Sequence, residues 1–177
     1  MQDIYIGDEG KGFPLVLVHG FLGSSKMWEP QIDFFKDNFR VITPDLPGFG
    51  ESYKAKSLNS INKMAKKIFN CIDKKNIKEF HLIGHSMGGM IAQEMANTSK
   101  ERINKLVCFA TGSIGDIPDR FETIDASIRR LKKEGIKETA KRIPPKWFVE
   151  GRKSKYFYLC ENAVKKITEE TAFNALT

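Results

Sequence analysis

Short apolar runs alternate with longer segments of helical periodicity over the first two thirds of the chain. The runs are rich in Leu, Val and Ile, and most of them lead into a Gly or a Pro, which is typical of strands buried on both faces of a sheet. They are residues 15–19 (LVLVH), 40–43 (RVIT), 80–84 (FHLIG) and 105–110 (KLVCFA), and the pattern also allows a strand at residues 2–6.

The segments between these runs repeat apolar residues every three to four positions, as amphipathic helices do. Residues 58–75 give the clearest stripe, with lysines on the opposite side. Residues 26–38 and 87–96 are the other two predicted helices, and Ser24 or Ser25 is a candidate N-cap for the first of them.

The last third of the chain is predicted to be helical throughout. Asp119 is a candidate N-cap for a helix that continues to residue 133, and Gly135 breaks the helix. A second helix covers residues 136–143 and stops at two prolines. Residues 155–166 and 168–176 form the remaining helical stretch. The chain therefore divides into an α/β part, residues 1–116, and a helical segment, residues 117–177.

Strands that alternate with helices predict the α/β class, with a mostly parallel sheet covered by helices on both faces. In such sheets, ligands bind at the carboxyl ends of the strands. The loops after His19, Pro44, Gly84 and Ala110 are therefore where chemistry is expected.

The charge balance narrows the class of partner. The chain has 29 basic and 22 acidic residues, a net charge of +7, but most of the cations are lysines interspersed with acids along helices. We therefore expect solvated helix faces and no nucleic-acid partner, because nucleic-acid readers favour Arg. An acidic protein partner, such as a carrier protein, stays an open alternative.

Membrane and secretory signals are not predicted either. The longest uncharged runs are interrupted by Gly, so no membrane span is expected. The first residues carry acids and no apolar core, unlike a signal peptide. Cys71, Cys108 and Cys160 are far apart and odd in number, which favours reduced thiols in a cytoplasmic protein.

The sharpest chemical signal is the sequence Gly84-His85-Ser86-Met87-Gly88, placed between a predicted strand and a predicted helix. A G-x-S-x-G sequence in that context is the nucleophile elbow, a turn that lifts the serine hydroxyl clear of the sheet. Gly84 and Gly88 leave room for the turn. Ser86 is therefore the predicted nucleophile.

The second signal is His19-Gly20-Phe21, directly after the first long strand. Acyl transfer needs two backbone N–H groups aimed at the developing oxyanion. Met87, the residue after the nucleophile, would supply one, and Phe21 is the first choice for the other, with Leu22 as the alternative. We interpret His19 as a structural residue that orients this loop.

These motifs resemble the α/β-hydrolase superfamily. LVLVHGF, PDLPGFGES and LIGHSMGGMIAQ occur in that order, and the closest similarity is to the lid-bearing esterase, lactonase and C–C hydrolase branch. The resemblance implies that residues 117–177 are a helical lid over the site. It also implies that Asp45 belongs to a structural loop, and that serine at the elbow forms an acyl-enzyme from an ester, thioester, lactone or activated ketone.

One element of the family pattern is missing. The family order is Ser, then an acid, then His, but His19, His81 and His85 all precede Ser86. The chain is expected to lack the family's C-terminal part, whether by cleavage, a split gene or truncation, and that part would supply the acid and the His. Asp116 is a weaker candidate for the acid.

The sequence therefore predicts a serine hydrolase of small carboxylic esters or lactones that needs no metal and no organic cofactor. Its partners would be the small-molecule substrate and a second chain carrying the rest of the fold. Two alternatives stay open: a non-catalytic relative that binds a ligand or protein, and perhydrolase or haloperoxidase activity at the same site.

Overall fold

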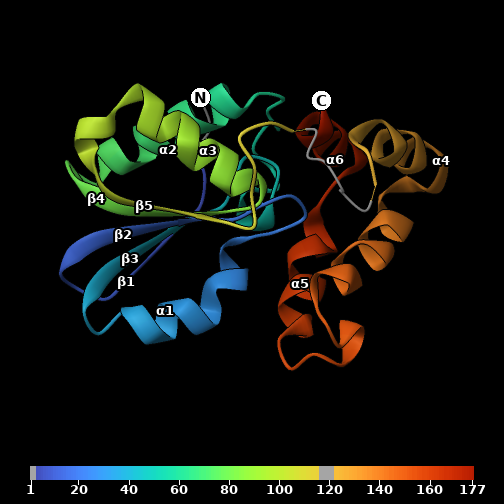
Figure 1. Cartoon of the computed structure of the whole chain (residues 1–177), viewed down its shortest axis with the longest axis horizontal. Coiled ribbons are helices and arrows are strands. Elements are labelled where there is room, and N and C mark those ends of the chain that lie inside the picture. Colours follow the sequence, from blue (N-terminus) through green and yellow to red (C-terminus); the bar gives the residue numbers. More distant parts are fainter. Residues whose placement is uncertain (1–2, 116–121) are drawn as a thin grey trace.

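A five-stranded sheet forms the centre of the molecule in the computed structural model, which describes residues 3–115 and 122–177 (Figure 1). The strand order is β1-β3-β2-β4-β5. The strands are β1 (Ile6–Glu9), β2 (Phe13–Val18), β3 (Phe39–Pro44), β4 (Phe80–His85) and β5 (Ile103–Phe109). All neighbours pair in parallel except β1, which runs antiparallel to β3. The mostly parallel sheet confirms the predicted fold class.

The first strand lies later in the chain than the predicted residues 2–6. In β1, Ile6 pairs with Pro44 and Glu9 pairs with Val41 of β3. Upstream of it, the Tyr5 backbone N–H donates to Ser52 Oγ at 2.8 Å rather than to a strand. The Tyr5 carbonyl still accepts from the Asp45 N–H at 3.0 Å, so one backbone contact with the chain after β3 remains there.

Helices cover both faces of the sheet (Figure 1). Helices α2 (Ile61–Lys74) and α3 (Met87–Thr98) pack one face, and α1 (Glu29–Phe35) packs the other. Alternate residues of β2 explain this division, because Val16 belongs to the cluster that contains α2 and α3 while Leu17 contacts the residues around α1. Successive strand residues point to opposite faces.

The first helix is shorter than predicted. A 3₁₀ turn, Ser25–Trp28, precedes α1, and Pro30 stands in the first turn of that helix. Neither serine caps it: the Ser24 and Ser25 hydroxyls are buried without a hydrogen-bond partner. The backbone N–H of Ser25 donates to Asp45 instead, so this segment is fixed by the buried carboxylate.

The helical segment that follows the sheet is called the lid segment here and comprises residues 122–177. It contains α4 (Ile124–Arg142), α5 (Phe157–Ala163) and α6 (Glu169–Leu176), joined by short 3₁₀ turns. Thr123 and Thr168 cap α4 and α6 through their hydroxyls. The predicted cap Asp119 lies outside the described residues. Gly135 interrupts α4 as expected, with φ 75° and ψ 172°.

The lid segment and the sheet share one hydrophobic core. Leu131, Ile143 and Leu176 of the lid segment belong to the same buried cluster as Ile42 and Leu82 of the sheet. The boundary that the sequence places between residues 116 and 117 lies outside the described residues, and the two-part division stays a prediction.

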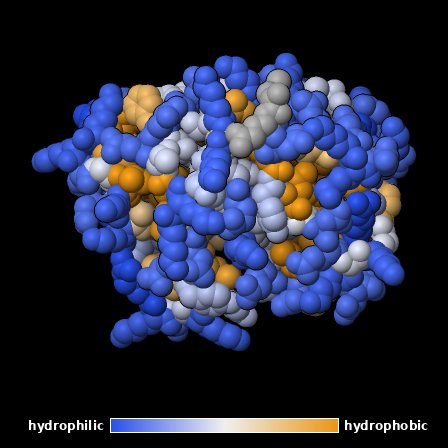
Figure 2. Space-filling model, turned by 180° about the vertical axis from the view of Figure 1, so that it is seen from behind, coloured by the Kyte–Doolittle hydropathy of each residue, from blue (hydrophilic) through white to orange (hydrophobic). Residues whose placement is uncertain are grey.

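Strand β5 forms an exposed edge of the sheet. It pairs with β4 alone among the described strands, and Leu106, Val107 and Phe109 are 40%, 48% and 59% exposed. Figure 2 shows one face, mostly hydrophilic, on which hydrophobic residues form a few separate groups. Within the described residues, no helix combines the length and apolar character needed to cross a membrane.

Candidate active site

Ser86 lies at the sharp junction of β4 and α3. Its backbone has φ 54° and ψ −122°, a left-handed conformation that costs a residue with a side chain roughly 1–3 kcal/mol. Two contacts with the β5 end of the sheet hold it: the Ser86 N–H donates to the Phe109 carbonyl at 3.0 Å, and Thr111 Oγ1 donates to the Ser86 carbonyl at 2.7 Å. The predicted strand–turn–helix geometry of an elbow is therefore present.

The two glycines of the motif are required by close backbone contacts. A β-carbon at Gly84 would overlap the Gly88 carbonyl, and one at Gly88 would overlap the carbonyls of Val18 and His19. Backbone atoms cannot move aside as the end of a side chain can. The spacing of glycines around Ser86 thus follows from the packing of β4, α3 and β2.

The loop after β2 reaches the elbow at Gly20. A side chain there would meet Ser86 Cβ at 2.9 Å and the Met87 amide nitrogen at 3.5 Å. Phe21 and Met87 line the same cavity as Ser86. Met87 opens α3, and first-turn amides have no acceptor within their own helix. The structure thus brings together the residues expected to form an oxyanion hole, and their role in catalysis stays a prediction.

His19 and Asp45 hold the surrounding loops. The Leu46 N–H donates to His19 Nε2 at 3.0 Å, so Nδ1 carries the proton and donates to the Gly20 carbonyl at 2.9 Å. The Asp45 carboxylate accepts the N–H groups of Ser25 and Glu51 at 2.5 and 2.7 Å. Burial lowers the pKa of His19, which keeps the ring neutral. Both residues have the structural place that the sequence indicated.

The other two histidine rings also have aromatic neighbours. His81 packs against Phe13, with ring centroids 4.6 Å apart, and lies five residues before Ser86 on the strand. His85 packs edge-on against Trp28 at 6.5 Å. Burial lowers the pKa of both.

A cavity of about 430 Å³ opens beside Ser86. Its walls come from the elbow, from the end of β5 and from the lid segment. The lid segment contributes Ile124, Ile143, Trp147 and Leu176, and α3 contributes Met90. Sequence analysis did not select Ile124, Ile143, Leu176, Met90 or Thr111, although it did single out the loop after Ala110. The lining beside Ser86 is predominantly apolar, which suits an uncharged organic group.

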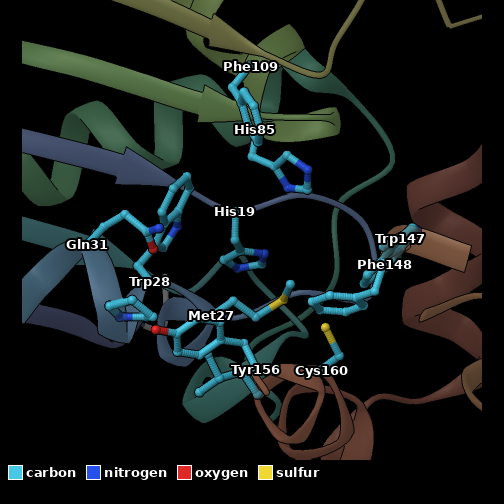
Figure 3. A pocket seen from close by; sticks show the side chains of 12 residues that line it. His19, Met27, Trp28, Gln31, His85, Phe109, Trp147, Phe148, Tyr156 and Cys160 are labelled. Atoms are coloured by element: carbon cyan, nitrogen blue, oxygen red, sulfur yellow. The ribbon is translucent and has the colours of Figure 1, made fainter. Parts of the chain in front are cut away.

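A second cavity of about 270 Å³ adjoins the first through His85, Phe109 and Trp147 (Figure 3). Aromatic and sulfur-containing side chains dominate it, and Cys160 is among them. Burial raises the pKa of Cys160 to about 11, so the thiol stays protonated at neutral pH and is a poor nucleophile. The three cysteines of the chain are free thiols.

Metal binding is not suggested by the arrangement of side chains. Over residues 3–115 and 122–177, no group of three or more His, Cys, Asp or Glu side chains is placed to share an ion.

Comparison with known proteins identifies the family. The family model described as the alpha/beta hydrolase fold matches residues 14–133. This match covers more than half of the chain, and the chain belongs to the α/β-hydrolase fold family.

Similar proteins include enzymes of more than one kind. The chain is 37% identical over 111 residues to the dihydrolipoyllysine-residue acetyltransferase component of the acetoin cleaving system of Pseudomonas putida, covering 63% of this chain and 30% of that protein. It is 34% identical over 113 residues to the pimeloyl-(acyl-carrier protein) methyl ester esterase of Legionella pneumophila, covering 60% and 41%. Other relatives are named as hydrolases.

A solved thermophilic esterase from Thermogutta terrifontis superposes with a TM-score of 0.80 at 30% identity. The alignment covers 98% of this chain and 65% of the esterase. The chain thus spans about two thirds of this solved relative and less than half of either curated one.

Proposed function

We propose that this chain carries the nucleophile of a serine hydrolase that acts on small carboxylic esters or lactones. The observation that supports this most directly is the left-handed backbone of Ser86 on the wall of a mostly apolar cavity. A non-glycine residue in that conformation is strained, and such strain gathers at functional sites. The hydrolases and esterases among the similar proteins favour the same reaction.

In the proposed reaction, Ser86 Oγ attacks the acyl carbon, and its proton passes to a base. The amides of Phe21 and Met87 donate to the oxyanion. The bond to the alcohol oxygen then breaks, the alcohol leaves with the proton, and an acyl-enzyme remains on Ser86. Attack by water releases the acid and restores the serine hydroxyl.

The base and its acid partner are proposed to come from a polypeptide segment outside this chain. The ring nitrogens of His19 both have backbone partners, and His81 and His85 pack among aromatic rings. The exposed edge of β5 offers a place for a further parallel strand, which would bring its carboxyl end beside Ser86. We place the reaction in the cytoplasm, where the three thiols would stay reduced.

The test begins with the protein purified from its own cells. Intact mass under denaturing conditions shows whether a second polypeptide accompanies the chain. A fluorophosphonate probe, which reacts with activated serines, should then label Ser86, located by peptide mass spectrometry. The Ser86→Ala variant should lose labelling, and turnover of p-nitrophenyl butyrate should fall by on the order of 10³-fold or more.

The matched control is Ser113→Ala, which removes an exposed serine near the same site and should keep both signals. Hydrolysis that persists in Ser86→Ala would overturn the assignment. A single species of this chain that binds ligands without hydrolysing esters would favour a binding protein instead.

A further inference from the structure

The lid segment contacts the Ser86 cavity through both ends of one bent helix. Ile124 is the first residue of α4 and Ile143 follows its last residue, and both line the cavity. Gly135 interrupts the helix between them with non-helical dihedral angles. The two halves of α4 can therefore change their angle at this glycine, unless another contact fixes them.

A buried carboxylate supplies that contact. Glu122, just before α4, is 9% exposed and accepts a hydrogen bond from Ser127 Oγ at 2.8 Å. Arg142, the last residue of α4, donates through Nη1 at 3.2 Å, and Arg130 Nε lies 3.0 Å from the other carboxylate oxygen. We call Glu122, Arg130 and Arg142 the α4 clasp, because they join the start of the helix to its end.

The carboxylate of the clasp is more buried than the other carboxylates that form ion pairs on this helix. Glu134 Oε2 lies 3.3 Å from Arg142 Nε, and the Glu134 side chain is 33% exposed. Lys141 and Glu138 lie 2.7 Å apart, but their side chains are 66% and 56% exposed; such pairs contribute little. The Glu122 side chain is 6% exposed. Its burial favours the neutral acid, but the hydrogen bonds from Ser127 and Arg142 outweigh this and hold the pKa of Glu122 below its usual value. The carboxylate is therefore charged at neutral pH, and removing its charge would leave Arg142 with Glu134 as its remaining carboxylate partner.

We propose that Glu122 is a positioning residue that, through Arg142, fixes Ile124 and Ile143 beside Ser86 and so sets the length of acyl group that the cavity accepts. The substrate class that fits these walls is an ester with an uncharged aliphatic acyl group, because the lid contributes branched aliphatic side chains. The inference rests on the proposed function in taking this cavity as the acyl site.

The test measures binding and needs no turnover. Trp147 lines the cavity, and Trp28→Phe leaves it as the sole tryptophan and a fluorescence reporter. Methyl ketones from 2-pentanone to 2-undecanone imitate the acyl chain and cannot be hydrolysed. In the Trp28→Phe protein, affinity should rise about fourfold per methylene, from ~0.8 kcal/mol each, up to a cut-off length and fall beyond it.

Glu122→Gln should remove or lengthen this cut-off. The ratio of Kd values for the ketones just below and just above it is expected to change by about tenfold. Glu122→Asp should restore part of the preference. Glu138→Gln, which removes a carboxylate charge from the exposed pair on the same helix, should leave the ratio within about twofold.

A folded Glu122→Gln protein with the parental cut-off would overturn the proposal, as would a parent without any cut-off. Circular dichroism checks folding. If Glu122→Gln unfolds, Arg142→Gln and Ser127→Ala test the same contacts, and the former should alter the cut-off more. If the probe does not label Ser86 but the chain-length cut-off is present and depends on the clasp, only the proposed function is rejected. If the probe labels Ser86 but the cut-off does not respond to Glu122→Gln, only this inference is rejected.

Discussion

At the scale of single residues, Ser86 combines backbone strain with a half-buried position on the cavity wall. Its left-handed conformation is imposed by the β5 contacts and by the glycines around it. Glycine adopts such a conformation without the steric cost, although it loses more entropy on folding. The serine is thus kept at a site where stability alone favours glycine.

Ser86→Gly should therefore unfold at a higher urea concentration than the parent. Its free energy of unfolding should rise by about 0.5–1 kcal/mol, because the relief of backbone strain exceeds the extra chain entropy that glycine loses on folding. Equilibrium denaturation followed by circular dichroism measures this. Ser113→Gly, at an exposed position, should show no gain. A Ser86→Gly protein less stable than the parent would mean that the surroundings, and not the serine, carry the strain.

His19 illustrates how a buried ring is fixed in one protonation state. Protonation would abolish the acceptor for the Leu46 N–H and charge a buried ring. Because the pKa is lower in the folded state, the unfolded chain binds a proton first. The contribution of neutral His19 to the free energy of unfolding is therefore complete above pH 6.5, and it is lost as the pH falls below that value.

Nitrogen-15 NMR should find the Nδ1–H tautomer of His19 at pH 7 and no titration above pH 6.5. The unfolding free energy of the parent should fall between pH 6.5 and 5 more steeply than that of His19→Gln, which has no such titration. Equal slopes in the two proteins, or an Nε2–H tautomer, would contradict this hydrogen-bond assignment.

At the scale of elements, Asp8 joins three segments that are distant in the sequence. It belongs to β1 and pairs with Arg40 of β3 at 2.7 Å and with Lys75, which follows α2, at 2.8 Å. Hydrogen bonds from Arg40 outweigh partial burial and, with Lys75, lower the pKa of Asp8 to about 2. The short strand β1 carries few apolar residues, so this carboxylate is an important part of its attachment.

Asp8→Asn should lower the unfolding free energy at pH 7 by about 1 kcal/mol, after allowance for solvent screening. The contribution of a carboxylate with a lowered pKa is complete above about pH 4 and is lost as the pH falls toward 2. The difference between the two proteins should therefore shrink below pH 4. Glu150→Gln on the exposed surface is the control, and a pH-independent difference for Asp8→Asn would refute the ionic explanation.

The strands and helices also show what a sequence pattern can predict. The buried strands and α2 follow from apolar periodicity, and the elbow follows from Gly84, Ser86 and Gly88 in a strand–turn context. Residues 6–9 read IGDE, which carries no strand pattern, and their pairing depends on β3. The individual lid residues that line the cavity could not be predicted, because Ile124 and Ile143 come beside the Ser86 cavity only through tertiary packing.

At the scale of the molecule, the lid segment and the sheet share one buried cluster. Polar contacts add to it: Tyr158 donates to Glu29 at 2.7 Å, and Asn174 donates to Ser57 at 2.7 Å. A common core predicts cooperative unfolding, because neither part keeps its apolar face covered without the other.

Two single-tryptophan variants test this cooperativity. Trp147→Phe leaves Trp28 beside α1, and Trp28→Phe leaves Trp147 in the lid segment. In urea, the fluorescence transitions of each variant should coincide with its transition by circular dichroism. A lid signal that changes at lower urea than the helical signal would show that the lid segment opens on its own.

The exposed β5 edge has a consequence for assembly: the relative rates of two pairing reactions decide whether the chain is assembled or aggregates. Backbone donors and acceptors on an open sheet edge can pair with any compatible strand. The partner segment proposed above and a second molecule of the same chain would therefore compete for this one edge. Pairing within a complex is independent of chain concentration once the partner is bound, whereas self-association grows with concentration. Dilute, slow synthesis should therefore favour the assembled site, and rapid overproduction should favour aggregates.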